Sequence, residues 1–310
     1  MVSKNNRNGF VLSLVLWISA ALMLLVLVYV KLTKEEASIY KQLHTKLDLE
    51  LAVESMFERL SFYLATGRVN GIGIVNTVKG LPKQINLDNT QYSFVDQNQD
   101  IECRFSLLDD SGLFKLKHLF FVHEVEKMIK QSEHKKYSFA DLYMDWIDAD
   151  NFTRVNGAEE SDYLLDGYKY RPANYNSFQH ISSVCLLKGF CHLDEQTKAN
   201  VMTHMSVYGY RPLNILLIDK MILKSIFPDY SEEEITNLLQ LKRKNFAEYT
   251  KMFDFLPYDA YGTGISKIIR ITITCTQTGK DDTIISRKKA IVDYRAFKNR
   301  SWTLFETQKF

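Results

Sequence analysis

An uncharged apolar run near the start of the chain limits the folds that this sequence can adopt. It extends from Phe10 to Val30 and follows a polar segment, residues 1–9, that contains Lys4 and Arg7. A helix rises about 1.5 Å per residue, so the run matches the hydrocarbon core of a bilayer, which is about 30 Å thick. We therefore expect residues 10–30 to form one transmembrane helix. The positive-inside rule places the basic segment in the cytoplasm and the rest of the chain across the membrane.

The apolar run differs from the core of a cleaved signal peptide. It is longer than the roughly 7–15 residues typical of such a core, and no Ala-x-Ala site follows it. An ordinary signal anchor is the stronger alternative. Helical periodicity continues beyond the run, and no proline interrupts residues 10–66. Apolar residues recur there every four positions, at Ile39, Leu43, Leu47 and Leu51, with Met56, Leu60 and Leu64 further on. We predict one long helix that ends at Gly67 and whose outer half packs on a sheet.

The rest of the chain alternates between strand-like and helix-like patterns. A glycine-containing loop is expected at 71–90. Strand pairs are predicted at 91–96 with 101–107 and at 267–276 with 283–294. Between them, residues 113–255 are predicted to be mainly helical, with helices at 120–131, 139–147, 213–227 and 232–244. A helical block bracketed by strands indicates an insertion into an α+β host.

Composition and motifs disfavour two classes of function. Lys and Arg number 39 against 37 Asp and Glu, so the charge is nearly balanced and no nucleic-acid partner is expected. The chain contains no G-x-S-x-G, H-E-x-x-H or G-x-x-x-x-G-K-[ST] motif, and its seven histidines are scattered. We therefore predict no catalytic residues.

The four cysteines are Cys103, Cys185, Cys191 and Cys275, and no C-x-x-C pair occurs. Cys185 and Cys191 are close enough to form a disulfide across a turn at Gly189 in an oxidising compartment, with two buried thiols as the alternative. Cys103 and Cys275 both lie on predicted strands, and the sequence does not decide whether they meet.

The junction between Gly9 and Phe10 precedes the apolar run. A Gly-Phe pair after a short basic leader resembles the prepilin peptidase site of type IV pilins and type II pseudopilins. This resemblance implies cleavage after Gly9 and a methylated Phe10 as the new N-terminus. Most pilins have Glu at the fifth mature position, where this chain has Leu14. A carboxylate in the membrane needs a partner, taken in pilins to be a neighbour's terminal amine, and a subunit that starts the filament has no such neighbour.

An acidic motif in the helical block gives the most specific resemblance. The motif is Asp145-Trp146-Ile147-Asp148-Ala149-Asp150, followed by Gly157-Ala158-Glu159-Glu160, Tyr163, Tyr170-Arg171 and Asn174. It resembles the type II secretion protein K family, the pseudopilins known for lacking the membrane Glu. The chain departs from the family pattern at Lys115, Lys117, Ser183-Val184 and Leu216, which indicates a divergent member.

The resemblance implies a minor pseudopilin of a type II secretion system that caps the tip of the periplasmic pseudopilus and helps initiate its assembly. It implies a pilin-like α+β fold, with a long transmembrane helix on a small antiparallel sheet and a large inserted helical domain. The expected domains are a leader (1–9), a transmembrane helix (10–30), a helix extension with first strands (31–108), the insert (109–258) and terminal strands (259–310). Phe10 and Leu14 would act in filament assembly.

Partners and location follow from the same resemblance. The chain would be a single-pass protein of the bacterial inner membrane with its C-terminal domain in the periplasm. Its partners would be the I- and J-type minor pseudopilins, the major pseudopilin and the prepilin peptidase, with secreted substrates or the outer-membrane secretin as further candidates. A signal-anchored periplasmic adaptor and a type IV pilus-like minor pilin are the alternatives.

The acidic motif places six carboxylates within the 18 residues from Asp145 to Asp162. Hard oxygen ligands at short spacings suit Ca²⁺, although the spacing is not that of an EF-hand. The family resemblance also implies calcium in the helical domain. The expected ligands are Asp148, Asp150 and Glu159, with Asp145, Glu160 and Asp162 as further candidates. The alternative is a loop in which the aspartates cap backbone N–H groups around a buried Trp146.

Overall fold

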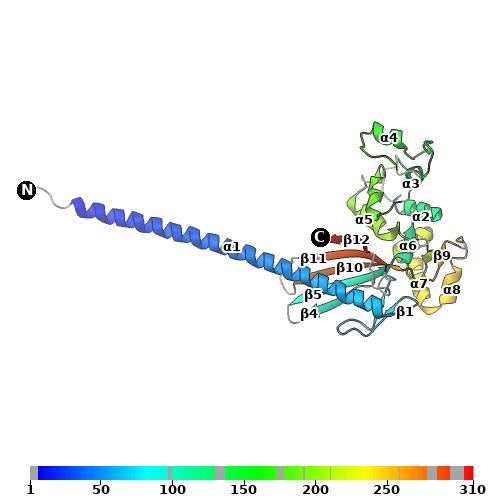
Figure 1. The fold of residues 1–310 in the computed structure, drawn as a ribbon, viewed down its shortest axis with the longest axis horizontal. Helices are drawn as coiled ribbons and strands as arrows, with labels where there is room; N and C mark the ends of the chain where they lie inside the picture. The colour runs from blue at the N-terminus through cyan, green and yellow to red at the C-terminus, as the bar shows by residue number, and fades with distance from the viewer. Residues whose placement is uncertain are drawn as a thin grey trace, which may run out of the picture.

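The structure, a computed structural model, describes residues 6–96, 100–129, 137–172, 178–190, 193–209, 211–257, 259–277, 285–293 and 304–309. For residues 6–11, 96 and 304–309 it describes the backbone alone. Figure 1 shows one long helix that leads into a head made of a sheet and a group of shorter helices. The predicted α+β class with a helical insertion is confirmed.

The long helix α1 runs from Asn6 to Thr66 and confirms the helix predicted from the apolar periodicity. From Leu12 onward it is long and apolar enough to cross a membrane, and its most apolar stretch is not covered by the rest of the protein. The helix ends where Gly67 N donates to Tyr63 O at 3.0 Å. A Cβ at Gly67 would overlap the side chain of Ile74, so glycine lets the following chain cross close to the helix end.

The segment predicted as a loop at 71–90 is partly strand. It contributes to a small antiparallel sheet in the order β1-β2-β3, made of Arg68–Asn70, Gly73–Val75 and Gln84–Asn86. Tyr63 Oη, from the last turns of α1, donates to Ile74 O and Lys83 O at 2.9 and 3.0 Å. Strands of three residues are too short to show an alternating pattern, so the loop prediction was wrong here because tertiary contacts hold the strands.

A five-stranded antiparallel sheet packs against the outer half of α1. Its order is β12-β11-β10-β5-β4. The strands are β4 (Tyr92–Asp96), β5 (Ile101–Asp109), β10 (Ile268–Gln277), β11 (Ile285–Asp293) and β12 (Leu304–Lys309). Both predicted strand pairs are confirmed, whereas β12 was not predicted. β10 pairs with β5, so the strands that precede and follow the helical insert are neighbours.

Two faces of α1 have different surroundings. One face is buried on the sheet, with Leu49, Leu60 and Tyr63 fully covered. Met56, Leu60 and Leu64 of the predicted apolar stripe lie in this buried face. The earlier members of the stripe do not: Ile39, Leu43, Leu47 and Leu51 are 57, 61, 54 and 60% exposed. These residues therefore do not hold the head together.

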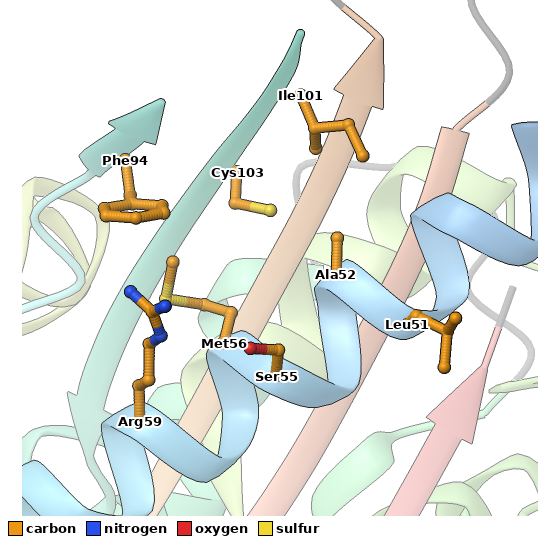
Figure 2. Close-up of a pocket in the computed structure, with 8 residues that line it drawn as sticks. All are labelled: Leu51, Ala52, Ser55, Met56, Arg59, Phe94, Ile101 and Cys103. Atoms are coloured by element: carbon orange, nitrogen blue, oxygen red, sulfur yellow. The ribbon is translucent and has the colours of Figure 1, made fainter. Parts of the chain in front are cut away.

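The seam between α1 and the sheet edge is open. Figure 2 shows Ala52 and Met56 of α1 facing Cys103 of β5, with Phe94 of β4 beside them. The guanidinium carbon of Arg59 lies 5.1 Å from the centre of the Phe94 ring. Residues of α1, β4 and β5 line a cavity of about 200 Å³ between the helix and the sheet.

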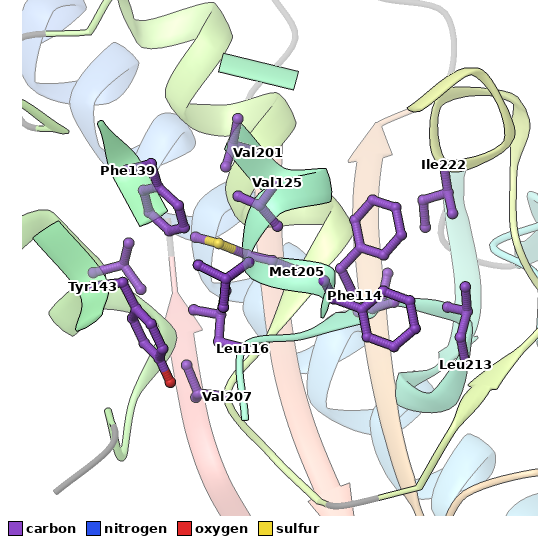
Figure 3. Packing of buried hydrophobic residues seen from close by; sticks show 14 of the residues in the cluster. Phe114, Leu116, Val125, Phe139, Tyr143, Val201, Met205, Val207, Leu213 and Ile222 are labelled. Atoms are coloured by element: carbon purple, nitrogen blue, oxygen red, sulfur yellow. The ribbon is translucent and has the colours of Figure 1, made fainter. Parts of the chain in front are cut away.

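The insert between β5 and β10 is mainly helical and has its own core. Its helices are α2 (Leu119–Ile129), α3 (Phe139–Ile147), α4 (Glu160–Leu165), α5 (Glu195–His204), α6 (Lys220–Ile226), α7 (Glu232–Lys244) and α8 (Phe246–Lys251). Two 3-10 turns occupy Asp110–Gly112 and Ile181–Leu186. Short parallel pairs join β6 (Phe114–Lys115) to β7 (Met205–Ser206) and β8 (Leu213–Asn214) to β9 (Tyr261–Gly262). Figure 3 shows side chains from several of these elements packed around Leu116 and Met205.

The helix predicted over 213–227 is wrong in its first half. Leu213 and Ile215 donate backbone hydrogen bonds to Ala260 and Gly262, which places this segment beside β9. The helix begins only after Asp219, whose carboxylate accepts from Ile222 N at 3.0 Å and caps α6. The apolar pattern continues without a break from the extended segment into α6. It therefore did not show that a turn and the Asp219 cap separate the two.

Candidate functional site

Three acidic side chains meet at one end of α3 in the insert. Asp145 lies in the last turn of α3, Asp148 directly follows that helix, and Glu159 directly precedes α4. Each offers a carboxylate oxygen within 4.8 Å of the others. Asp145 and Glu159 are 0 and 2% exposed, and Asp148 is partly buried. The structure therefore brings together two of the three expected ligands, Asp148 and Glu159, with Asp145 as the third member.

An arginine that sequence reasoning missed lies against this acidic cluster. Arg154 Nη1 is 2.5 Å from both Asp145 Oδ1 and Asp148 Oδ2. Its backbone N also donates to Asp145 Oδ2 at 3.1 Å. The carboxylates of Asp148 and Asp145 raise the pKa of the Arg154 guanidinium. One signal in the sequence could have indicated this contact. Arg154 is the only Lys or Arg between Asp145 and Asp162.

Two oxygens of the acidic cluster stay without a hydrogen-bond partner in the described part of the chain. They are Asp148 Oδ1 and Glu159 Oε1, and both are buried. Burial, followed by the nearby charges of Asp145, Asp148 and Asp150, raises the pKa of Glu159 to about 7. Burial also raises the pKa of Asp145, against the opposing effect of Arg154. A cluster with three carboxylates, one guanidinium and two unpaired buried oxygens fits a hard cation.

A glycine lets the loop pass close to this cluster. Any Cβ at Gly157 would overlap the carboxylate of Asp145. Gly157 N donates to Arg154 O at 3.0 Å, which closes the turn between the two halves of the motif. The Gly157-Ala158-Glu159 run thus positions Glu159 against α3.

The remaining predicted ligands lie outside the cluster and act locally. Asp150 accepts from Phe152 N at 2.9 Å. Asp162 accepts from Glu159 N at 2.9 Å and from Thr153 Oγ1 at 3.2 Å. Glu160 Oε1 lies 3.4 Å from Arg171 Nη1. Asp150 and Asp162 therefore cap backbone N–H groups, which is the alternative to calcium binding that the sequence left open.

Aromatic side chains pack around Trp146, the residue that follows Asp145 in α3. Trp146 is buried and meets Tyr163 edge to face, with ring centres 5.7 Å apart. Phe178 and Tyr170 lie at 5.4 and 6.3 Å from the same ring. Asn174, the last residue of the predicted motif, lies outside the described residues. We therefore expect the fluorescence of Trp146 to respond to changes in this part of the insert.

A second charged cluster joins the insert to the sheet. Lys115 Nζ pairs with the carboxylate of Asp110, and both side chains are almost fully buried. Arg270 of β10 contacts the same carboxylate at 3.2 Å and donates to Met205 O at 2.8 Å. Lys115 is one of the positions where the chain departs from the family pattern, and its charge is matched by Asp110.

The cysteines and the N-terminal residues complete the comparison with the sequence. Cys103 and Cys275 form a disulfide across β5 and β10, with Cα atoms 4.1 Å apart. Cys191 lies outside the described residues, so its predicted bond to Cys185 stays a prediction. Gly9 and Phe10 lie in the first turns of α1, where only the backbone is described. Leu14 is on the uncovered part of that helix and is 48% exposed.

A long apolar helix packed on an antiparallel sheet, with a helical insert between two neighbouring strands, defines a pilin-like class of fold. No family model matches the chain, and no curated protein matches its sequence. The fold is similar to a chain in a crystal structure described as the GspK-GspI-GspJ complex from the enterotoxigenic Escherichia coli Type 2 Secretion System. The TM-score is 0.56 at 14% identity, covering 89% of this chain and 99% of that one. The chain therefore has a GspK-like fold, as the sequence resemblance implied.

Proposed function

We propose that this protein is a minor pseudopilin of a type II secretion system, which caps the tip of the periplasmic pseudopilus and helps initiate its assembly. The observation that carries this proposal is the GspK-like fold over 89% of the chain. Leu14 supports the tip position, since a subunit with no earlier neighbour has no partner for a membrane carboxylate.

The surface of α1 supports assembly by helix packing. Its first half is apolar and uncovered, and the stripe of Ile39, Leu43, Leu47 and Leu51 continues this surface beyond the membrane segment. The similar structure is a complex of GspK with GspI and GspJ. By analogy, the I- and J-type minor pseudopilins would be the direct partners in the inner membrane and periplasm, and the major pseudopilin would follow below them.

The insert supports the capping role. In Figure 1 its helices extend from the end of the head that is far from the N-terminus of α1. A further subunit added above this head would meet the insert instead of a bare sheet and helix. Assembly would therefore end at this subunit, which also leaves the insert available to secreted substrates or the outer-membrane secretin.

Immunogold labelling tests the tip position. Filaments would be produced in cells that overexpress the secretion system, and antibodies against the insert would be applied. We expect gold particles at filament ends. Particles along the filament length would contradict the tip position and favour an ordinary minor pilin, and the absence of filament labelling would favour a signal-anchored adaptor.

We also infer that the acidic cluster binds calcium. Asp145, Asp148 and Glu159 would supply the carboxylate oxygens, and the ion would join the end of α3 to the start of α4. The unpaired Asp148 Oδ1 and Glu159 Oε1 support this inference. Calcium titration of the full chain, followed by tryptophan fluorescence, tests it. We expect a response that Glu159→Gln abolishes, and no response below millimolar calcium would contradict the inference.

A further inference from the structure

The Arg154 side chain occupies the charge-balancing position of the acidic cluster. Its Nη1 atom lies 2.5 Å from one oxygen of Asp145 and 2.5 Å from one oxygen of Asp148. These two carboxylates are also two of the three groups that would hold calcium. Asp148 Oδ1 is unpaired, but both oxygens of Asp145 contact Arg154, one at Nη1 and one at the backbone N. A calcium ion bound to Asp145 and Asp148 would therefore lie beside the guanidinium, and the two cations would repel each other in a partly buried site.

One internal cation leaves the acidic cluster under-neutralised. Three carboxylates face a single guanidinium, and Glu159 Oε1 has no partner although its side chain is almost fully buried. A buried carboxylate oxygen without a partner is costly, which favours a cation with a higher charge than that of arginine. The acidic cluster thus contains one cation, Arg154, and still carries negative charge that this cation does not neutralise.

The loop that carries Arg154 is fixed by contacts that do not involve its guanidinium. Arg154 N donates to Asp145 Oδ2 and Gly157 N donates to Arg154 O. Ser138 N donates to Asn156 O at 3.0 Å, which ties the same loop to the start of α3. The Arg154 side chain is 36% exposed, so it has a path to solvent that leaves the loop in place.

We propose that Arg154 is a built-in competitor of calcium at this site. Without calcium, its guanidinium balances Asp145 and Asp148 and holds the loop that follows α3 against the end of that helix. When calcium binds, the guanidinium leaves the two carboxylates and turns to solvent. This proposal rests on the calcium binding inferred above, and it makes the insert stable without metal at the expense of a weaker apparent affinity for calcium.

The test compares the full-length chain in detergent with Arg154→Gln and with a matched control. Arg171→Gln removes an arginine that is 73% exposed and pairs with Glu160, outside the acidic cluster. Calcium affinity is measured by isothermal titration, and the melting temperature is measured in EGTA and in calcium. For Arg154→Gln we expect calcium affinity to rise roughly tenfold or more, since the competing bound state is gone. We also expect a lower melting temperature in EGTA that calcium restores, and Arg171→Gln should match the wild type.

Two outcomes overturn the proposal and separate it from calcium binding itself. If the wild type binds calcium and Arg154→Gln binds it with equal or lower affinity, Arg154 is not a competitor although the metal site stands. If neither protein binds calcium, both the metal site and the competition are wrong. Should Arg154→Gln unfold in EGTA, Arg154→Lys keeps a positive charge with a single-point contact. Its calcium affinity should exceed that of the wild type, and an unchanged affinity there would equally refute the proposal.

Discussion

Cys103 in β5 and Cys275 in β10 face each other across neighbouring strands and form a disulfide over a separation of 172 residues. The whole helical insert lies between them in the sequence. The bond therefore holds together the two strands from which the insert leaves and to which it returns. A disulfide is typical of an oxidising compartment, which agrees with a head outside the cytoplasm.

Removing this disulfide should destabilise the head. A bond that closes so long a loop limits the unfolded chain strongly, and its loss costs about 2–5 kcal/mol. We expect Cys103→Ala combined with Cys275→Ala to lower the free energy of unfolding by that amount in denaturant titrations followed by circular dichroism. Equal stability of the double variant and the wild type would contradict the structural role of the bond.

Stability should depend on the protonation of His204. Its Nε2 lies 2.7 Å from Asp219 Oδ2 and its Nδ1 lies 2.6 Å from Asn200 O, so both ring nitrogens face acceptors. Burial lowers the pKa of His204, but Asp219 and the Asn200 carbonyl outweigh burial and raise it. The stabilisation is therefore complete below the unfolded pKa of about 6.5 and is lost as pH rises through the higher folded value.

The matching measurement is the melting temperature at several pH values from 6 to 9. We expect the wild type to lose stability as pH rises through the folded pKa of His204. His204→Gln should be less stable at the lower pH and should lack this part of the pH dependence. Parallel curves for the two proteins would show that the histidine is not protonated in the folded head.

Gly157→Ala should disrupt the acidic cluster. The added Cβ would overlap the Asp145 carboxylate, so either that carboxylate or the loop must move. We expect a loss of about 1–3 kcal/mol in stability and a weaker response to calcium. Gly262→Ala is the control, because its Cβ would lie 3.6 Å from Pro212, an ordinary contact. Calcium binding at wild-type affinity by Gly157→Ala would argue against this arrangement of ligands.

Leu14→Glu tests the account of the filament start. A carboxylate at a membrane position costs up to about 3 kcal/mol unless it finds a partner. A tip subunit offers it none, so we expect less of the I- and J-type pseudopilins to co-purify with Leu14→Glu than with the control Leu14→Met. Equal or greater recovery would mean that the position tolerates an internal subunit's residue.

The sequence predicted those elements whose residues carry a local signal. The strand pattern at 267–276 predicted β10, and the helical pattern at 232–244 predicted α7 at its observed bounds. The helix α1 followed from an apolar run and a continued period without proline. For β10 and α7 the pattern and the burial agree because one face of the element meets the core, whereas the apolar first half of α1 is not covered by the rest of the protein.

The parts that escaped prediction depend on contacts between distant segments. β1, β2 and β3 are held by Tyr63, and β8 is held by β9 from far along the chain. The disulfide needed the register between β5 and β10, which no local pattern supplies. At the acidic cluster the motif predicted Asp148 and Glu159 together, but Arg154 reaches Asp148 only through the path of the loop.

The central claim, that this chain is a processed pseudopilin, is tested most directly by the N-terminus of the protein recovered from bacterial membranes. Mass spectrometry of the N-terminal peptide would identify the first residue and any methyl group. The account predicts a chain that begins at a methylated Phe10, and a Gly9→Leu variant that stays unprocessed. An intact Met1, or a cut after residue 30, would contradict it and would leave a signal-anchored or secreted protein with a GspK-like fold.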